Sequence, residues 1–332
     1  LLIASDKVGV NSSIEILLKS FNLVNAVGET FQIDPGRPGV PEFGSKLYHL
    51  KYVSFYKPIS KVKLNPVEEY AILKKTNKSS IHQLQKDELL FWRKKYLTFI
   101  DRIGKTRFSS IVFDYDGTLC SYDRRYAGFL TEDISIELIR LLKAGIKVGI
   151  ATGRGQSVKT DLRNSKIPKA YWENIIIGYY NGASIGSLND DSYPNIELKP
   201  NLKLSNIENV IKSLKLPYSE LKIKLRPFQL TIETCDASIW NLIKKIVQNI
   251  VMVSSDGELQ LLESSHSIDV VVRDKASKLN VVNKCIELSK SENCLTIGDK
   301  GQWPGNDYEL LSTPNSLSVD DVSAHPNNCW NL

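Results

Sequence analysis

The chain has 332 residues, 42% hydrophobic and 24% charged, so it is long enough for two or three domains with their own cores. This composition excludes a disordered chain, and no apolar run reaches the roughly 18 to 20 residues that a membrane helix needs. The five cysteines are scattered without a Cys-x-x-Cys pair, which argues against a disulfide framework and against a zinc site. Because the first residues show no signal-peptide pattern, the chain is predicted to be cytoplasmic.

The net charge of +6 is unevenly distributed along the chain. Residues 1–107 hold 18 Lys and Arg against 10 Asp and Glu, a balance of +8, and the rest holds 25 against 27, a balance of −2. A basic segment can bind nucleic acid, but these lysines are dispersed and not interleaved with aromatic residues, so a solvated surface is favoured. The start at Leu1 without a Met leaves open whether the chain is a fragment of a longer protein.

The N-terminal segment is predicted to begin with a strand and a helix. Residues 1–4 are apolar enough for a strand, and Ser12 with Glu15 three residues later forms a capping box before an amphipathic helix. The prolines and glycines of residues 34–41 then break regular structure. From Leu89 an apolar stripe at gaps of three and four residues predicts a connecting helix that ends at Gly104.

After Arg107 the pattern changes to alternating strands and helices, which indicates a parallel sheet. The helix expected at residues 133–144 has Thr131 as its cap and Gly145 as its stop. The four apolar runs that are typical of buried strands are Ile111 to Phe113, Lys147 to Ala151, Ile175 to Tyr179 and Cys294 to Ile297.

Residues 183–272 have the pattern of a separate, inserted unit. Apolar and basic residues alternate at positions 221–226, as in a strand with one buried face, and helices are expected near residues 206–214 and 237–250. Lys222, Lys224, Arg226 and Arg273 either lie on a solvent face, which is the usual case, or line a substrate face. The predicted fold class is α/β, a Rossmann-like parallel-sheet core (residues 108–182 and 273–332) with an inserted α+β cap domain (183–272) and an N-terminal α/β or helical segment (1–107).

Four short polar segments follow predicted strands or open a helix, and ligands of parallel sheets bind at the carboxyl ends of the strands. They are Asp114-Tyr115-Asp116-Gly117-Thr118-Leu119, then Thr152-Gly153-Arg154, then Lys278 with Lys275 nearby, and finally Asp299 with Gly305-Asn306-Asp307. Paired carboxylates can attack and handle protons, a hydroxyl and free amides can hold phosphate oxygens, and further carboxylates suit magnesium. The combination indicates phosphoryl transfer. Read separately, Asp114 and Asp116 could cap a turn, Thr152 could cap the next helix, and Lys278 could be a solvated helix residue.

These motifs, in this order, resemble the haloacid dehalogenase superfamily, specifically phosphatases with a large α+β cap of the Cof-type and sucrose-phosphatase-like group. The resemblance covers residues 108 to about 321, and Tyr180-Asn181-Gly182-Ala183 resembles the passage that leads into such a cap. Asp-x-Asp-Gly-Thr alone is moderately specific and Thr-Gly-Arg alone is weak, but all four motifs in order are specific.

The resemblance implies a role for each matching residue. Asp114 would be the nucleophile that forms an aspartyl-phosphate, Asp116 the general acid and base, and Thr152 and Lys278 would bind the phosphoryl group and offset its charge. Gly117, Gly153, Arg154, Asn181 and Asn306 would contact phosphate or substrate, and Mg2+ would be held by Asp114, Asp116 through its backbone carbonyl, Asp299 and Asp307. Crowded carboxylates around a phosphate also require a divalent cation on electrostatic grounds.

Two assignments stay open at this point. In the family the second acid of the last motif follows the first after about four residues, whereas Asp307 follows Asp299 by eight, so the roles of Asn306 and Asp307 are uncertain and Trp303 could lie near a substrate. Lys278 is favoured as the lysine because of its distance from Asp299, with Lys275 as the alternative.

The first hundred residues resemble the end of a sugar isomerase domain, and about 40 of them carry the resemblance: the strand, the helix and the passage from Gly28-Glu29 to Asp34-Pro35-Gly36-Arg37-Pro38. The alternative is a helical appendage that supports the cap or forms a homo-oligomer. The predicted function is a Mg2+-dependent phosphatase acting on a small phosphorylated metabolite, a sugar phosphate by preference, with neither membrane nor nucleic acid as partner. The alternatives are a phosphomutase with the same aspartyl-phosphate and a non-catalytic protein that binds phosphorylated ligands or nucleic acid.

Overall fold

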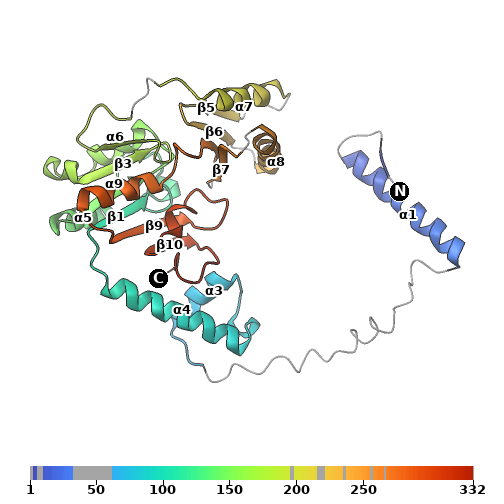
Figure 1. The fold of residues 1–332 in the computed structure, drawn as a ribbon, viewed down its shortest axis with the longest axis horizontal. Coiled ribbons are helices and arrows are strands. Elements are labelled where there is room, and N and C mark those ends of the chain that lie inside the picture. Colours follow the sequence, from blue (N-terminus) through green and yellow to red (C-terminus); the bar gives the residue numbers. More distant parts are fainter. Residues whose placement is uncertain are drawn as a thin grey trace. The chain divides into compact units, whose positions relative to one another are not determined.

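The computed structural model forms two compact units, Leu1–Lys57 and Pro58–Leu332 (Figure 1). The structure describes residues 3–5, 10–32, 62–194, 198–214, 221–234, 237–254, 257–264 and 267–331.

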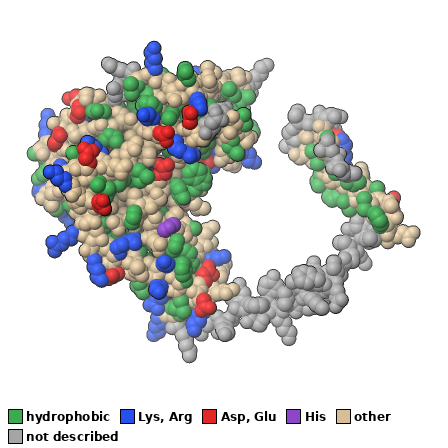
Figure 2. Space-filling view, in the orientation of Figure 1, with side chains coloured by type: hydrophobic (Ala, Val, Ile, Leu, Met, Phe, Trp, Pro, Cys, Tyr) green, Lys and Arg blue, Asp and Glu red, His purple; other side chains and the backbone are tan. Residues whose placement is uncertain are grey.

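The described part of the first unit is dominated by helix α1 (Val10–Phe31). Ser12 lies inside this helix, which begins three residues before the start that a Ser12 cap predicts, and Ile3 and Ala4 form no strand. Large hydrophobic side chains are exposed along α1, Leu17 and Phe21 among them, and Figure 2 shows them as green atoms. The passage from Asp34 to Pro38 lies outside the described residues, and the resemblance to a sugar isomerase domain and the homo-oligomer stay predictions.

The second unit begins with a helical hairpin. Helix α3 (Pro66–Thr76) starts at Asn65, whose side chain accepts a hydrogen bond from the backbone of Glu68 at 2.8 Å, and its first turn holds acidic residues as the helix dipole favours. After η2 (Ile81–Gln83), helix α4 (Lys86–Lys105) confirms the predicted connecting helix. The apolar faces of α3 and α4 pack around Trp330 near the end of the chain.

The core of the second unit is a six-stranded sheet in the order β10-β9-β1-β2-β3-β4 (Figure 1). All neighbouring strands are parallel except β4, which is antiparallel to β3, and the predicted α/β fold with a parallel core sheet is confirmed. The strands are β1 (Ser110–Asp114), β2 (Lys147–Ala151), β3 (Ile175–Tyr179), β4 (Ser184–Ser187), β9 (Cys294–Lys300) and β10 (Ser316–Asp321).

Both faces of this sheet are covered, which explains why its central strands are apolar throughout. Helices α5 (Glu132–Lys143) and α6 (Gln156–Asn164) pack on one face, against Ile150 and Ile177. Helix α9 (Leu279–Ser289) packs on the other face against Val112, where Gly149 allows close approach, because a Cβ there would lie 2.7 Å from a methyl group of Val112. The short helices η3 (Tyr122–Arg124), η4 (Lys169–Asn174) and η6 (Leu310–Ser312) lie in the connections.

The cap is a four-stranded antiparallel sheet in the order β5-β6-β8-β7. Its strands are β5 (Leu221–Leu225), β6 (Gln229–Thr234), β7 (Leu259–Glu263) and β8 (Ser267–Val272). Helices α7 (Leu202–Ser213) and α8 (Ala237–Ser254) cover its apolar face, on which Leu230, Ile232 and Val270 are buried. The predicted α+β cap is confirmed, while the exact domain boundaries stay predictions. No helix in the described ranges has the length and apolar character of a membrane span.

Candidate active site

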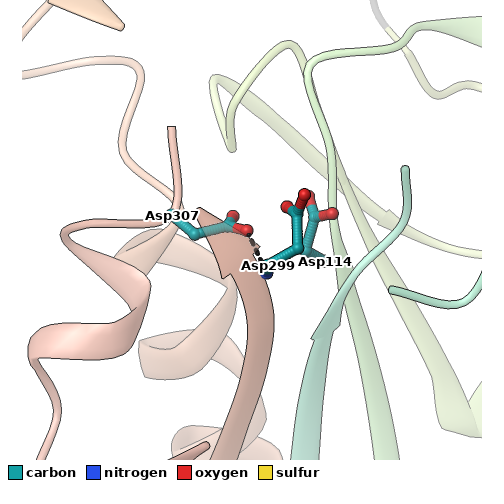
Figure 3. A group of neighbouring side chains, drawn as sticks. All are labelled: Asp114, Asp299 and Asp307. Carbon is teal, nitrogen blue, oxygen red and sulfur yellow. Dashed lines mark hydrogen bonds between the residues drawn. The ribbon is translucent and has the colours of Figure 1, made fainter. Parts of the chain in front are cut away.

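The carboxyl ends of three neighbouring parallel strands bring the polar motifs together. Asp114 is the last residue of β1, Thr152 directly follows β2, and Asp299 lies near the end of β9. Carboxylate oxygens of Asp114, Asp299 and Asp307 lie within 4.8 Å of one another, and all three residues are buried. Figure 3 shows the Asp114 and Asp299 carboxylates side by side, with Asp307 reaching the backbone of Asp299.

Lys278 lies between two of these carboxylates. Its Nζ donates to Asp114 Oδ1 and to Asp307 Oδ1, each at 2.5 Å, and the lysine is buried, whereas Lys275 is exposed. Burial lowers the pKa of Lys278, but Asp114 and Asp307 outweigh that effect and raise it, so the ammonium stays charged. Of the two lysines left open by the sequence, Lys278 is the one in the cluster.

Burial raises the pKa of all three carboxyl groups, but their charged neighbours shift each pKa differently. Burial and the charge of Asp307 raise the pKa of Asp114 well above its usual range, although Lys278 opposes this. The same two causes, burial first, raise the pKa of Asp299 to about 7, with a hydrogen bond from Tyr122 acting in the opposite direction. For Asp307 burial raises the pKa, but Lys278 outweighs it, so the pKa is lowered. Three ionised carboxylates would exceed the charge of the single lysine, and this repulsion adds to burial in raising the pKa of Asp114 and of Asp299.

The donor set fits a hard divalent cation. Asp114 Oδ2 and Asn306 Oδ1 are buried oxygens without a hydrogen-bond partner, and buried acceptors of this kind normally have one. Oxygen ligands from carboxylates and amides are those that Mg2+ takes in proteins. A cation beside Asp114, Asp299 and Asp307 would offset the excess negative charge.

The carboxylate of Asp116, which lines the same pocket as Asp114 and Asp299, is paired with two arginines. Arg154 Nε donates to Asp116 Oδ2 at 2.8 Å, and a second nitrogen, Nη2, donates to Oδ1. Arg125 Nε lies 3.5 Å from the same carboxylate. Arg154 also donates through Nη1 to Asp161 Oδ2 at 3.1 Å. Arg154, predicted to contact phosphate or substrate, is therefore engaged by carboxylates of the chain itself.

Thr152 and Asn181 lie where the second strand meets the cap. Thr152 is buried, its Oγ1 accepts from the backbone N–H of Arg154 at 3.1 Å, and its carbonyl accepts from the N–H of Asn181 at 2.8 Å. The Asn181 side chain donates to Gln229 of the cap at 3.2 Å, and Gln229 donates to Asp269 at 3.0 Å. Asn181 thus links the cap to the core, and it is not among the described residues that line the pocket.

A pocket of about 280 Å3 opens between these motifs and the polar face of the cap sheet. Its core side holds predicted residues, namely Asp114, Asp116, Thr152, Gly153, Arg154, Asp299 and Asn306. Lys224 and Arg226 line its cap side, so of the two alternatives for these residues the structure places them toward the site.

Sequence reasoning missed several residues that line this pocket: Tyr122, Arg125, Tyr126, Asp161, Gln229, Thr231, Glu233, Ser264, Ser267 and Asp269. Two signals were present. The aromatic and basic run from Tyr122 to Tyr126 directly follows the first motif, and polar residues alternate along β6. Neither signal predicts which of these side chains line the pocket.

The long loop before Asp307 is held by the cap. The backbone N–H of Glu263 donates to Pro304 O, and the N–H of Asn306 donates to Glu263 O, both at 2.9 Å. With the loop held in this way, Asp307 accepts a hydrogen bond from the backbone N–H of Asp299, although eight residues separate the two in sequence. Asn306 lines the pocket. Trp303 is exposed, packs edge-on against Tyr308, and is not among the described residues that line the pocket.

Residues 111–223 match the sequence family described as haloacid dehalogenase-like hydrolase. This part of the chain is similar in sequence to the haloacid dehalogenase-like hydrolases. The resemblance stated from the motifs is confirmed for this part of the chain as far as the hydrolase family. A search of curated proteins finds no match.

Solved structures similar to this chain include an IMP-nucleotidase and a trehalose-6-phosphate phosphatase. The IMP-bound, N-terminally truncated IMP-nucleotidase of Plasmodium falciparum has a TM-score of 0.50 and 15% identity, covering 79% of this chain and 76% of that one. Trehalose-6-phosphate phosphatase of Aspergillus fumigatus has a TM-score of 0.46 and 16% identity, covering 71% and 91%. At such identities the first likeness shows a shared fold, while the function of this chain depends on its own site.

Proposed function

We propose that this chain is a Mg2+-dependent phosphatase that acts on a small phosphorylated metabolite through an aspartyl-phosphate. The observation that carries the proposal is the position of Asp114. It is buried at the end of a central strand, bonded to Lys278, adjacent to Asp299 and Asp307, and open to a polar pocket that also contains Asp116.

Each residue has a chemical role in this reaction. Asp114 attacks phosphorus while the bond to the leaving oxygen breaks, and Asp116 gives that oxygen a proton. Asp116 then takes a proton from water as the water attacks phosphorus and the bond to Asp114 breaks, which restores both carboxyl groups. Lys278 neutralises charge on Asp114, and Thr152, which lines the same pocket, would hydrogen-bond the phosphoryl group.

The cation would be held by Asp114, Asp299 and Asp307, with Asn306 as a further oxygen at the pocket wall. When bound, it would polarise the phosphoryl group and screen it from the carboxylates. Lys278, already bonded to two of these carboxylates, keeps the remaining charge of the cluster low enough for an anionic substrate to approach.

The pocket supports a polyhydroxylated leaving group such as a sugar. Its volume of about 280 Å3 is at the lower end for small-molecule sites, which argues against a macromolecular substrate in the pocket itself. The cap contributes charged, amide and hydroxyl side chains, and the aromatic residues in its described lining are Tyr122 and Tyr126. Side chains of this type bind hydroxyl groups through hydrogen bonds.

The test is phosphate release from sugar phosphates, trehalose 6-phosphate, IMP and an aryl phosphate, with Mg2+ or with a chelator. We expect release that requires Mg2+ and that falls at least about 1,000-fold in Asp114→Asn, because an amide cannot act as the nucleophile. Asp101→Asn is the matched control, since Asp101 is exposed on α4 and its carboxylate pairs with Lys105 on the same helix.

Asp114→Asn as active as the wild type would refute the covalent mechanism. Transfer of phosphate between positions of a sugar in the presence of a sugar bisphosphate, without net phosphate release, would replace the phosphatase by a phosphomutase. Binding of phosphorylated ligands without turnover would support a binding protein instead.

A further inference from the structure

Tyr122 begins the short helix η3, directly after the tight turn that follows Asp114. In this turn the N–H of Gly117 donates to Cys120 O at 2.7 Å, and the N–H of Cys120 donates to Tyr115 O at 2.8 Å. The turn reverses the chain, so that the ring of Tyr122 reaches across the first motif to β9. The tyrosine lines the same pocket as Asp114 and Asp299.

The phenol of Tyr122 donates a hydrogen bond to Asp299 Oδ2. The backbone is shaped for this contact at Gly117, which has a φ of 90°. A Cβ at that position would lie 2.6 Å from both Asp299 Oδ2 and Tyr122 Oη, closer than real Cβ contacts allow. A side chain at position 117 would therefore separate the hydroxyl from the carboxylate.

The Asp299 residue is held from two sides. Tyr122 bonds its carboxylate, and Asp307 Oδ2 accepts from its backbone N–H at 2.9 Å. An ionised carboxylate has about four acceptor positions, so the bond to Tyr122 leaves acceptor positions for a cation. Hydrogen bonds from residues around a metal site orient the ligating side chains and raise metal affinity.

We propose that Tyr122 is a positioning residue for the cation, and that its hydroxyl fixes the Asp299 carboxylate in the orientation that completes the site with Asp114 and Asp307. This inference rests on the proposed metal-dependent function. It adds to that function a residue outside the four motifs, contributed by the segment between the first motif and α5.

The test measures the affinity of the full chain for Mn2+ without substrate. Electron paramagnetic resonance of the free ion monitors the binding. We expect Tyr122→Phe, which removes only the hydroxyl, to weaken Mn2+ binding about 10-fold, the lower end of the effect of such outer contacts. Tyr126→Phe is the matched control, because Tyr126 lines the same pocket, is 84% exposed and has its ring beside Arg125 and Arg154. Its Mn2+ affinity should equal that of the wild type.

Three results would contradict the inference, and they are distinguishable. Equal Mn2+ binding by Tyr122→Phe and wild type would remove the role of Tyr122 and leave the proposed function intact. Tighter binding by Tyr122→Phe would show that the hydroxyl competes with the cation. A wild type that binds no Mn2+ would overturn the metal-dependent function together with the inference. Matching circular dichroism spectra and melting temperatures would establish that the variants are folded.

Discussion

Arg154 is the residue on which the orientation of Asp116 depends most directly. It donates to both carboxylate oxygens of Asp116, to Asp161, and to the backbone carbonyl of Arg125 at 2.7 Å. Its guanidinium also lies over the ring of Tyr115, 4.9 Å from the centroid. A planar group with this many fixed partners can hold an acid and base residue in one orientation, which the flexible ammonium of lysine cannot do.

We therefore expect Arg154→Lys to lower kcat about 10- to 100-fold, because a displacement of about 1 Å in a catalytic group costs up to about 100-fold. Arg163→Lys is the control, since Arg163 lies on α6, directly after the loop of Arg154, but bonds Leu188 O and Asp191, which do not line the pocket. Steady-state kinetics on the best substrate of the panel measure both. A kcat for Arg154→Lys within twofold of the control would show that Asp116 keeps its orientation without the bidentate contact.

Individual site residues could be predicted where a motif follows an apolar strand. Asp114, Thr152 and Asp299 come together because parallel strands end at one edge of the sheet, and this follows from strand order and the chain pattern alone. Tyr122 could not be predicted, because its direction depends on the conformation of a turn. The side-chain direction of Asp116 also depends on partners, Arg125 and Arg154, that only the folded chain brings close.

Among the elements, strand β5 shows what alternation can and cannot predict. Leu221, Ile223 and Leu225 pack on the cap core, so the period-2 pattern correctly predicts a strand with one apolar face. The polar face was expected to contact solvent in the usual case, but Lys224 and Arg226 line the pocket. The sequence pattern has no information on whether a polar face meets water or another domain, because both environments favour the same residues.

Two lysines, Lys222 and Lys224, lie on the same face of β5. Lys224 lines the pocket and pairs with Glu233 at 3.4 Å, whereas Lys222, two residues earlier, is exposed and is not among the described residues that line the pocket. We expect Lys224→Met to raise KM several-fold with little change in kcat, because it removes a contact to the leaving group that is equal in ground and transition states. Lys222→Met should leave both parameters unchanged.

Kinetics on the same sugar phosphate measure this pair of variants. Equal KM values for Lys224→Met and Lys222→Met would mean that the leaving group does not reach β5. A loss of kcat without a change in KM would instead place Lys224 among the groups that act in the transition state.

In the second unit as a whole, the N-terminal helical hairpin is joined to the end of the chain through Lys75. Its Nζ donates to the carbonyls of Ser323, His325 and Asn328 at 2.7, 2.8 and 2.7 Å, and it lies 5.0 Å from the ring centroid of Trp330. The final residues also extend the sheet edge, since the N–H of Ser318 in β10 donates to Trp330 O at 2.9 Å. A single buried lysine thus joins segments about 250 residues apart in sequence.

The buried position of Lys75 makes stability depend on pH. Burial lowers the pKa of Lys75 from 10.5 to about 8. Between these values the unfolded chain binds more protons than the folded one, so the free energy of unfolding rises with pH across this window. The gain in free energy of unfolding from deprotonating Lys75 is complete above pH 10.5 and is lost as the pH falls through 8. For a pKa shift of this size the gain has an upper limit of about 3 kcal/mol.

Urea unfolding of wild type and Lys75→Met at several pH values between 8 and 10.5 measures this contribution. Lys75→Met should be less stable than the wild type throughout, since it leaves three buried or partly buried carbonyls without their donor. The difference in free energy of unfolding should widen as the pH rises, because only the wild type gains stability from the lowered pKa of Lys75. Lys78→Met, at an exposed lysine just after α3, should follow the wild-type curve. Parallel curves for wild type and Lys75→Met would mean that Lys75 keeps an ordinary pKa in the folded chain, with its charge offset by the three carbonyl dipoles and the face of Trp330.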